Sequence, residues 1–487
     1  MPNLIDRIVG TFSPLAGLRR HHARELLGRA YEGASPRDGW KPRRAGASAN
    51  TDQAMDAQTL RIRARSLYQN VGYITRGVEA KVANVIGTGI TPNSLAPNAQ
   101  RVNQLWAQWA SVADADGVFD LYGLMAAAYR ATVLDGEVLI RKRTRRTEDG
   151  LPAPLQFQLL EIDWLDTAKT GTNGGNHIIA GIEYNPVGQR VAYWLFDQHP
   201  GEQVGFRRAR TASRPVPAAA IIHLYNPARP GQGRGVTDLA SIIARTRDLE
   251  TYDDSERARK NLESRLAVLA SGDVTQMQAP GPGEVADHAT GQIGSLAGGS
   301  IMRVPDGVNL TVVKPEAVPG FAEYYRLQLH IIAAGMGVTY EMLTGDVSQV
   351  NFSSARVALL EFRRFAEQVQ WLVLVPKMCA PIWAAFIEAA VLAGKLPPAQ
   401  SQDVDWATPK WDYVNPVQDV NADLAEISGG LSSISEKLRR RGYKPDQVFK
   451  ELKSDLDRLK ADGTLDLLVM LQKGRTMAEA TREPTSP

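Results

Sequence analysis

The sequence is poor in cysteine, with one among 487 residues. A single thiol excludes an internal disulfide framework and a cysteine-rich zinc module, and it suits a reducing compartment. Cys379 lies in an apolar run, so we expect a buried side chain. The sequence also has no GxxxxGK[ST] phosphate loop, no HExxH zinc motif and no GxSxG nucleophile elbow. These absences exclude a P-loop ATPase and leave no residue to nominate as catalytic, cofactor-binding or metal-binding, so we expect no enzyme.

Positive and negative charges nearly balance, with a formal net charge of +3. A globally basic coat for nucleic acid is therefore not expected. An excess of positive charge is found locally, because residues 1–50 carry nine Lys or Arg and only four Asp or Glu. We predict a basic, partly disordered arm over residues 1–55, which either touches an acidic neighbour or is simply solvated.

Long hydrophobic runs are scarce. The N-terminal stretch is broken by Asp6, Arg7 and Pro14, which argues against a secretion signal. The most apolar stretch, residues 369–394, is interrupted by two prolines, a lysine and a glutamate. We therefore expect no membrane span.

The apolar pattern changes twice along the chain, and it predicts an α+β fold. Apolar residues recur every three or four positions from Leu60 to Val78, which predicts one amphipathic helix ending near Gly87 or Gly89. Residues 133–226 show short strands between Gly, Pro and Asn turns, which predicts an antiparallel β unit with a hairpin tip at 185–188. Helices are expected again at 236–265, 321–334, 354–375 and 381–393, a strand pair at 300–305 and 310–315, and a helix pair broken at Gly429-Gly430, with Ser433 and Glu436 as a capping box.

Three short motifs could carry chemistry, and each also has a structural explanation. Asp135 and Glu137 could bind a metal, although an acidic pair at a turn is more often structural. RPGQGRG at 229–235 resembles a phosphate-cradling loop, but we favour a tight entry into a helix. The sharpest basic cluster comprises Arg141, Lys142, Arg143, Arg145 and Arg146. It could lie near a phosphate backbone, and we favour a solvated or intersubunit surface.

The stretch GMGVTYEMLTGDVSQVNFSSARVALLEFRR, residues 335–364, is polar in its first half and helical in its second. Residues 337–354 contain no Lys or Arg. An enzyme lid, a ligand loop and a pore-lining loop all fit such a composition. We expect its three glycines (Gly335, Gly337 and Gly345) to permit movement, and Ser353 or Ser354 to cap the helix that follows.

The order of motifs over residues 30–450 resembles the lambda-type portal proteins of tailed bacteriophages. The motifs are LRIRARSLYQN, ANVIGTGI, DGEVLIRKR, LQFQLLEID, HIIAGIEYNPVGQRVAYWL, IIHLYNPARPGQGRGV, the stretch at 335–364, and WDYVNPVQDVNADLAEISGGLSSISEKLRRRGYKPDQV. The arm, residues 270–300 and the C-terminal tail carry no matching motif.

The resemblance implies a portal fold with a helical wing, an antiparallel β unit, a two-helix stem, a small α/β clip and a helical crown. It places the wing at 56–235 and 353–414, the stem helices at 236–265 and 321–336, the clip at 266–320, the crown at 415–470 and a disordered tail at 471–487. Residues 337–352 become a loop that faces DNA in the tunnel, with its polar contacts made by Tyr340, Glu341, Thr344, Asp346, Ser348, Gln349 and Asn351.

The resemblance also implies a dodecameric ring at one capsid vertex, through which double-stranded DNA is packaged and ejected. The expected partners are other copies of the chain, DNA in transit, the terminase large subunit, the major capsid protein with its scaffold, and the head-tail connector, with no membrane and no cofactor. The expected location is the virion, and the host cytoplasm during assembly. A capsid or head-tail adaptor that forms no ring is the alternative. A maturation protease or packaging nuclease would need a nucleophile–base pair or clustered carboxylates, and we can nominate neither.

Overall fold

The computed structural model describes residues 46–204, 207–208, 212–264, 267–271, 309–313, 320–348, 351–409, 411, 416–441, 443, 445–462 and 464. Its contacts divide the chain into Met1–Met55 and Asp56–Pro487. Of the first unit, residues 46–55 are described, and they include the start of the first described helix. The predictions for the rest of the arm, for residues 272–308 of the clip and for the tail lie outside the described residues.

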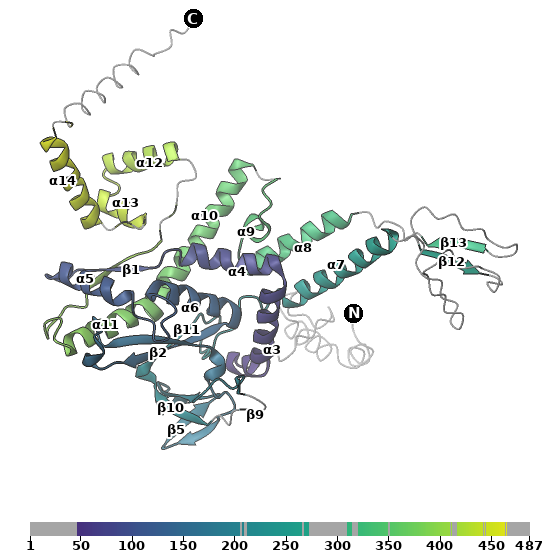
Figure 1. Ribbon diagram of the computed structural model, residues 1–487, viewed down its shortest axis with the longest axis horizontal. Helices are drawn as coiled ribbons and strands as arrows, with labels where there is room; N and C mark the ends of the chain where they lie inside the picture. Colours follow the sequence, from purple (N-terminus) through teal and green to yellow (C-terminus); the bar gives the residue numbers. More distant parts are fainter. Residues whose placement is uncertain are drawn as a thin grey trace, which may run out of the picture. The chain divides into compact units, whose positions relative to one another are not determined.

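Helices and strands alternate along the described chain (Figure 1). The α-helices are α3 (Ala49–Asn70), α4 (Gly72–Val85), α5 (Ala99–Ala110), α6 (Leu121–Asp135), α7 (Ile243–Ser264), α8 (Phe321–Met336), α9 (Tyr340–Thr344), α10 (Phe352–Val369), α11 (Ala380–Leu392), α12 (Pro416–Ser428), α13 (Ile434–Arg440) and α14 (Pro445–Ala461). A π-helix, η7, spans Gln370–Cys379, and 3-10 turns are η3 (Thr147–Asp149), η4 (Ile162–Trp164) and η5 (Ala218–Ala220). The strands are β1 (Thr91–Ser94), β2 (Glu137–Thr144), β3 (Leu155–Leu160), β4 (Gly171–Asn173), β5 (Asn176–Ile179), β6 (Ile182–Tyr184), β7 (Arg190–Phe196), β8 (Gln203–Val204), β9 (Arg207–Arg208), β10 (Ser213–Pro217), β11 (Ile221–Tyr225), β12 (Ala267–Ser271), β13 (Asn309–Val313) and β14 (Val404–Ala407).

The helix predicted at 60–78 is two helices, because Val71 is extended (φ −116°, ψ 101°) between α3 and α4. The predicted apolar face is confirmed, since Ala64, Ile74 and Val78 are fully buried. Both helices pack against the same core. The apolar spacing therefore continues across the break, and periodicity alone could not reveal it.

The predicted antiparallel β unit is confirmed and consists of two sheets. One has the order β11–β2–β3, the other β10–β7–β6–β5–β4, and neighbouring strands in both sheets are antiparallel. The predicted hairpin tip joins β6 to β7: Asn185 N donates to Gln189 O at 2.9 Å, and Gly188 has a φ of 85°. A second small core fills the space between the two sheets, with Leu139 and Leu195 buried in it.

The helix predicted at 236–265 starts later, at Ile243. The residues before it form turns, in which the Thr237 hydroxyl donates to a carbonyl oxygen of α6 at 3.0 Å. α7 and α8 then lie side by side in opposite directions (Figure 1). Tyr252 stacks on Phe321 between them, with ring centroids 5.5 Å apart. α7 leads into β12, which pairs with β13, so one of the two strands predicted before α8 is present and the other lies outside the described residues.

α10, η7 and α11 form one helical run, although the sequence predicted an interruption at its prolines. Pro376 has no N–H and crowds the preceding turn of an α-helix. The backbone here widens into the π-helix Gln370–Cys379 and the run continues. Cys379 is fully buried in it, as predicted, and burial raises the pKa of its thiol to about 12.

Part of this run, Ser354–Leu392, is long and apolar enough to cross a membrane. Half of its most apolar window is buried against the rest of the chain. Core helices of soluble proteins share that length and composition, so the observation is weak support for a span.

The C-terminal helix pair predicted on either side of Gly429-Gly430 is confirmed as α12 and α13, and α14 follows. Ser433 caps α13, as predicted, with its hydroxyl accepting a hydrogen bond from Glu436 N at 3.0 Å. The sequence pattern therefore located both the break between α12 and α13 and the start of α13.

Candidate channel segment and neighbouring charged clusters

A short helix divides the segment that was predicted as an unbroken loop over 337–352. Tyr340–Thr344 form the five-residue helix α9. Thr339 starts it, since its hydroxyl accepts a hydrogen bond from a backbone N–H within the first turn, at 3.2 Å. Leu343 is fully buried against α4. Gly77 on α4 makes room for it, because a Cβ there would lie 2.8 Å from Leu343 Cδ1. The polar composition of the segment concealed this one apolar anchor.

The three glycines serve close packing and helix ends, where we had expected them to permit movement. Gly335 lies inside α8, and a Cβ there would lie 2.3 Å from Ile242 Cγ2. Gly337 ends α8 with a φ of 69°, and Gly345 ends α9 with a φ of 77°. Left-handed residues of this kind are ordinary helix C-caps. They fix the direction of the chain at two points.

The predicted polar residues of the segment bind one another. The Tyr340 hydroxyl donates to Asp346 Oδ2 at 3.4 Å, and the Tyr340 ring stacks on His330 with centroids 4.1 Å apart. The Thr344 hydroxyl donates to Tyr340 O at 2.9 Å and accepts from Asp346 N at 3.1 Å. Ser348 N donates to Asp346 Oδ1 at 3.0 Å. Hydrogen bonds from Ser348 lower the pKa of Asp346, so the carboxylate stays charged.

The segment ends in a helix cap. Asn351 Oδ1 accepts from Ser354 N at 2.8 Å, so Asn351 caps α10, where the sequence predicted Ser353 or Ser354. Asn is at least as good an N-cap as Ser. Asn351 caps the helix because it directly precedes the first residue of α10, whereas Ser353 and Ser354 lie inside the first turn. Glu341 is half-buried on α9. Gln349 lies outside the described residues.

Arg76 binds this segment from another helix, and the sequence analysis did not identify it. It lies on α4, and its Nε donates to Met342 O at 3.1 Å across a sequence separation of 266 residues. Its guanidinium therefore covers the carbonyl end of α9, where a cation is favourable. Arg326 on α8 also contributes to lowering the pKa of Asp346. No local pattern points to either arginine, since both are remote in the sequence from the acidic stretch.

The predicted basic cluster lies along β2 and the turn after it: Arg141, Lys142, Arg143, Arg145 and Arg146. Its arginines bind glutamines of β3: Arg143 Nη2 donates to Gln158 Oε1 and Arg145 Nε to Gln156 Oε1, each at 2.7 Å. Burial and the neighbouring Arg143 lower the pKa of Arg141. β2 packs on β3, β11 and α6, whereas α9 packs on α4 and α8. The two predicted groups are therefore held by different elements.

The two carboxylates of the Asp135–Glu137 motif bind different partners. Asp135 accepts hydrogen bonds from Arg65 Nε and Nη2 at 2.8 and 2.6 Å. Glu137 is fully buried and accepts from Arg234 Nε at 2.8 Å and from Gly235 N at 3.0 Å. A Cβ on Gly235 would lie 1.9 Å from a carbonyl oxygen at the start of β2. The RPGQGRG motif therefore has a structural role: it packs closely against the start of β2 and binds Glu137 there.

His223 completes this buried network as a neutral ring. Its Nε2 lies 2.9 Å from Glu137 Oε2, and its Nδ1 lies 3.2 Å from Arg190 Nη1, which can only donate. Nε2–H therefore donates to the carboxylate and Nδ1 accepts. Burial lowers the pKa of His223, and the arginines add to this against the pull of Glu137. Burial works to raise the pKa of Glu137, but Arg234 and His223 outweigh it and hold that pKa well below its usual range.

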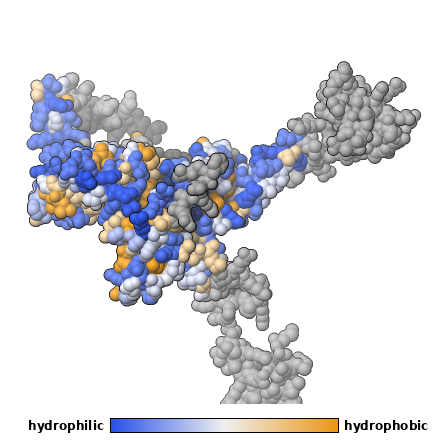
Figure 2. All heavy atoms as spheres, turned by 60° about the horizontal axis from the view of Figure 1, so that its bottom comes forward, coloured by the Kyte–Doolittle hydropathy of each residue, from blue (hydrophilic) through white to orange (hydrophobic). Residues whose placement is uncertain are grey.

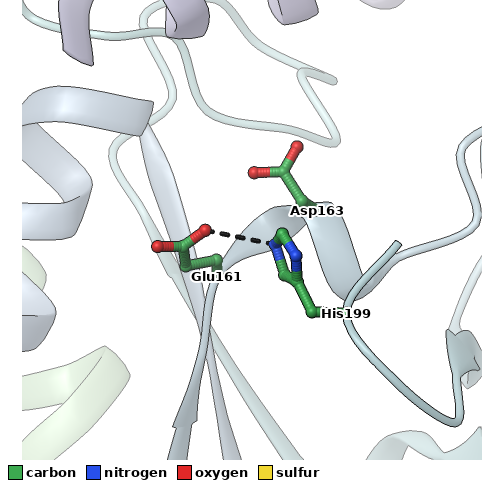
Figure 3. A group of neighbouring side chains, drawn as sticks. All are labelled: Glu161, Asp163 and His199. Atoms are coloured by element: carbon green, nitrogen blue, oxygen red, sulfur yellow. Dashed lines mark ion pairs between the residues drawn. The ribbon is translucent and has the colours of Figure 1, made fainter. Parts of the chain in front are cut away.

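Glu161, Asp163 and His199 form the one group in the described part of the chain close enough to share a metal ion. Figure 3 shows the imidazole facing the two carboxylates, with His199 Nε2 3.3 Å from Glu161 Oε2. Arg61 lies 2.8 Å and Arg65 2.7 Å from Asp163, and Arg65 lies 3.3 Å from Glu161. Burial works to raise the pKa of Asp163, and the two arginines outweigh it and lower that pKa. Arg61 and Arg65 bind these carboxylates, and Arg65 also binds Asp135, so the group is part of an ion-pair network.

Comparison with known proteins places the chain in a family. The family described as "Phage portal protein, lambda family" matches residues 34–370, which is more than half of the chain. The "Probable portal protein" of Halomonas phage phiHAP-1 is 28% identical over 432 residues, covering 84% of this chain and 82% of that protein. "Portal protein B" of Escherichia phage lambda is 20% identical over 438 residues, covering 80% and 81%.

Among solved structures, a chain of "Neck of native GTA particle computed with C12 symmetry" is 17% identical, with a TM-score of 0.44, covering 83% of this chain and 95% of that chain. The assignment rests on the family match over residues 34–370 and not on this distant structural likeness. The resemblance seen in the order of sequence motifs is confirmed. The chain belongs to the lambda family of phage portal proteins.

Proposed function

We propose that this portal protein forms a closed dodecameric ring at one vertex of the capsid, and that double-stranded DNA passes through the ring during packaging and ejection. Portal proteins are structural rather than catalytic. The ring assembles in the host cytoplasm with the capsid protein and scaffold, binds the terminase motor, and later binds the head-tail connector. A capsid or head-tail adaptor protein that forms no ring is the alternative.

The parts of the subunit follow from the family. The wing comprises residues 56–235 with 353–414, and α7 and α8 are the two stem helices. The hairpin β12–β13 belongs to the clip at 266–320, and α12–α14 belong to the crown at 415–470. Residues 337–352 face the DNA.

One observation carries the channel assignment. The segment between α9 and α10 presents acidic and hydroxyl groups, and those groups are already hydrogen-bonded to one another. A Lys or Arg on a channel wall would neutralise DNA phosphates and release their counterions. The affinity of the wall for DNA would rise, and the DNA would slide more slowly. Asp346 repels phosphates, and Arg76 on the adjoining helix is occupied by Met342 O. Such a wall contacts DNA without holding it.

Ring formation is tested by electron microscopy of the purified protein with native mass spectrometry. Twelve copies of the 53.2 kDa chain would give about 640 kDa. Rings with an axial channel support the portal assembly. Monomers or open dimers that persist when scaffold and capsid protein are added would favour the adaptor.

The channel assignment is tested at Val347, which is 68% exposed. Val347→Lys adds a cation, and Val347→Gln is its neutral control of similar length. Substituting Asp346 with Lys is less clean, because it also removes the acceptor for Ser348 N. We expect the lysine variant to slow DNA packaging in reconstituted capsids and the glutamine variant to package as the parent does. The difference should shrink at higher salt. Equal packaging by both variants would contradict the channel assignment.

For the basic cluster of β2 we propose an intersubunit surface. Arg143 and Arg145 are tied to neutral glutamines, so their charges remain for carboxylates of an adjacent subunit. The triple variant Arg141→Ala, Arg143→Ala, Arg145→Ala should form fewer rings in native mass spectra. An unchanged ring fraction would exclude this role.

A further inference from the structure

Within the C-terminal helical unit, α12–α14, ion pairs join α12 to α13. Lys437 Nζ lies 2.8 Å from Asp423 Oδ1 and also pairs with Glu426, and Arg441 pairs with Asp423. These contacts join α13 to α12 through their polar faces. In an isolated helical unit the apolar faces normally meet inside and the charges face water. Here many apolar side chains remain exposed, while Ile427, Leu438 and Val448 are half-buried.

Two separate apolar seams result, and within α12 and within α14 the exposed apolar residues recur in steps of three and four. The α12 seam runs over Val417, Val420 and Leu424 and continues after the helix at Leu431 and Ile434, with exposed fractions from 37% to 82%. The α14 seam consists of Phe449, Leu452 and Leu456, with exposed fractions from 42% to 54%. Such spacing is the pattern of helices that pack lengthwise on another helix. Apolar side chains also reach the surface elsewhere on the molecule (Figure 2), for example Tyr324, Leu327 and Ile331 on α8.

Neither seam covers the other within one chain, since both are exposed in the same subunit. In a ring the subunits meet head to tail, so every subunit must offer two different complementary faces. A unit with two unlike apolar seams on different helices fits this requirement. A partner protein from outside the ring would need only one of them.

We infer that the α12 seam of one subunit packs against the α14 seam of its neighbour, so that the C-terminal units form their own continuous belt. This inference rests on the ring assembly proposed above. It assigns to α12 and α14 the role of a second, hydrophobic contact between subunits, separate from the basic cluster of β2. The competing occupant is the chain's own apolar sequence LDLLVML at 465–471, which follows α14.

Cysteine crosslinking tests the seam contact, because the native Cys379 is fully buried and does not compete. The variant Leu424→Cys, Leu452→Cys places one thiol on each seam. The control pair, Ala422→Cys and Ser454→Cys, places exposed thiols on the opposite faces of the same two helices. Full-length rings are treated with a short bismaleimide and separated on denaturing gels.

The seam pair should give a ladder of covalent oligomers, and each single variant and the control pair should stay monomeric. Dimers from the single Leu424→Cys or Leu452→Cys variants would mean like-to-like contact and would overturn the inference. A double variant linked only within one chain would do the same. Native mass spectrometry of the same samples distinguishes failure of the seam contact from failure of the ring assembly. Intact rings without a ladder of crosslinked oligomers would refute the seam contact but not the ring.

Discussion

Leu343→Ala tests whether α9 is anchored as the structure indicates. Leu343 is fully buried against α4, and α9 has only five residues. A helix that short does not form alone in water, so its order depends on tertiary contacts. Replacing a buried leucine with alanine costs about 2–5 kcal/mol. If that cost falls on the docking of α9, the undocked population rises at least about 30-fold, since 1.4 kcal/mol is a factor of ten.

Hydrogen–deuterium exchange read by mass spectrometry gives this population for the peptide that covers 337–348. Leu360→Ala is the matched control, because Leu360 lies on α10 and is 43% exposed. We expect faster exchange in α9 for the Leu343 variant and unchanged exchange for the control, with α4 still protected in both. Equal exchange in α9 for the two variants would refute the anchor. The hydrogen bond from Arg76 and the ring stack on Tyr340 would then be what holds this helix.

Three further predictions concern buried groups. Glu137→Gln should lower the free energy of unfolding by about 3–5 kcal/mol, because it leaves Arg234 buried without its carboxylate; urea denaturation measures this, with the exposed Glu148→Gln as the control expected to change little. The pKa of His223 is lowered from 6.5 in the folded chain, so its contribution to stability is complete above pH 6.5 and is lost as the pH falls. Below pH 6.5 the unfolded chain binds a proton at His223 that the folded chain does not, so the free energy of unfolding falls by up to about 1.4 kcal/mol per pH unit. If the free energy of unfolding of a His223→Gln variant had the same pH dependence between pH 6.5 and 5.5 as that of the parent, this prediction would be wrong. Burial raises the pKa of the Cys379 thiol to about 12, so Ellman's reagent at pH 8 should detect no thiol in the native protein and one after denaturation.

Local sequence patterns were sufficient to predict an element wherever its own residues determine where it begins and ends. The strand pair β6–β7 needed only its alternation and the Asn185–Gly188 turn. Gly429-Gly430 and the Ser433 cap placed the boundary between α12 and α13. The break at Val71 was missed because both helices bury the same face, and Pro376 was read as a stop because the widening to a π-helix depends on packing around the run.

The channel segment shows the opposite case. Its composition predicted a flexible polar loop, but three contacts with remote residues order half of it. Gly77 admits Leu343, Arg76 covers the end of α9, and His330 stacks on Tyr340. Each contact joins positions whose pairing leaves no trace in a single sequence. Composition could therefore indicate which polar groups the segment carries but not how many of its residues are held by remote contacts.

The two anchors of the segment limit how far the channel wall proposed above can move. With α9 fixed up to Gly345 and the α10 cap fixed at Asn351, five residues lie between them. A fully extended residue spans at most about 3.6 Å, so the length of chain between the two anchors sets an upper limit of about 10 Å on its reach away from them. An adjustment to passing DNA fits within that reach. A larger closure of the channel requires α9 to leave α4, and the exchange rate of α9 then sets how often it happens. Leu343→Ala should therefore change such closure, while Val347→Lys should change the affinity of the wall for DNA and leave α9 docked.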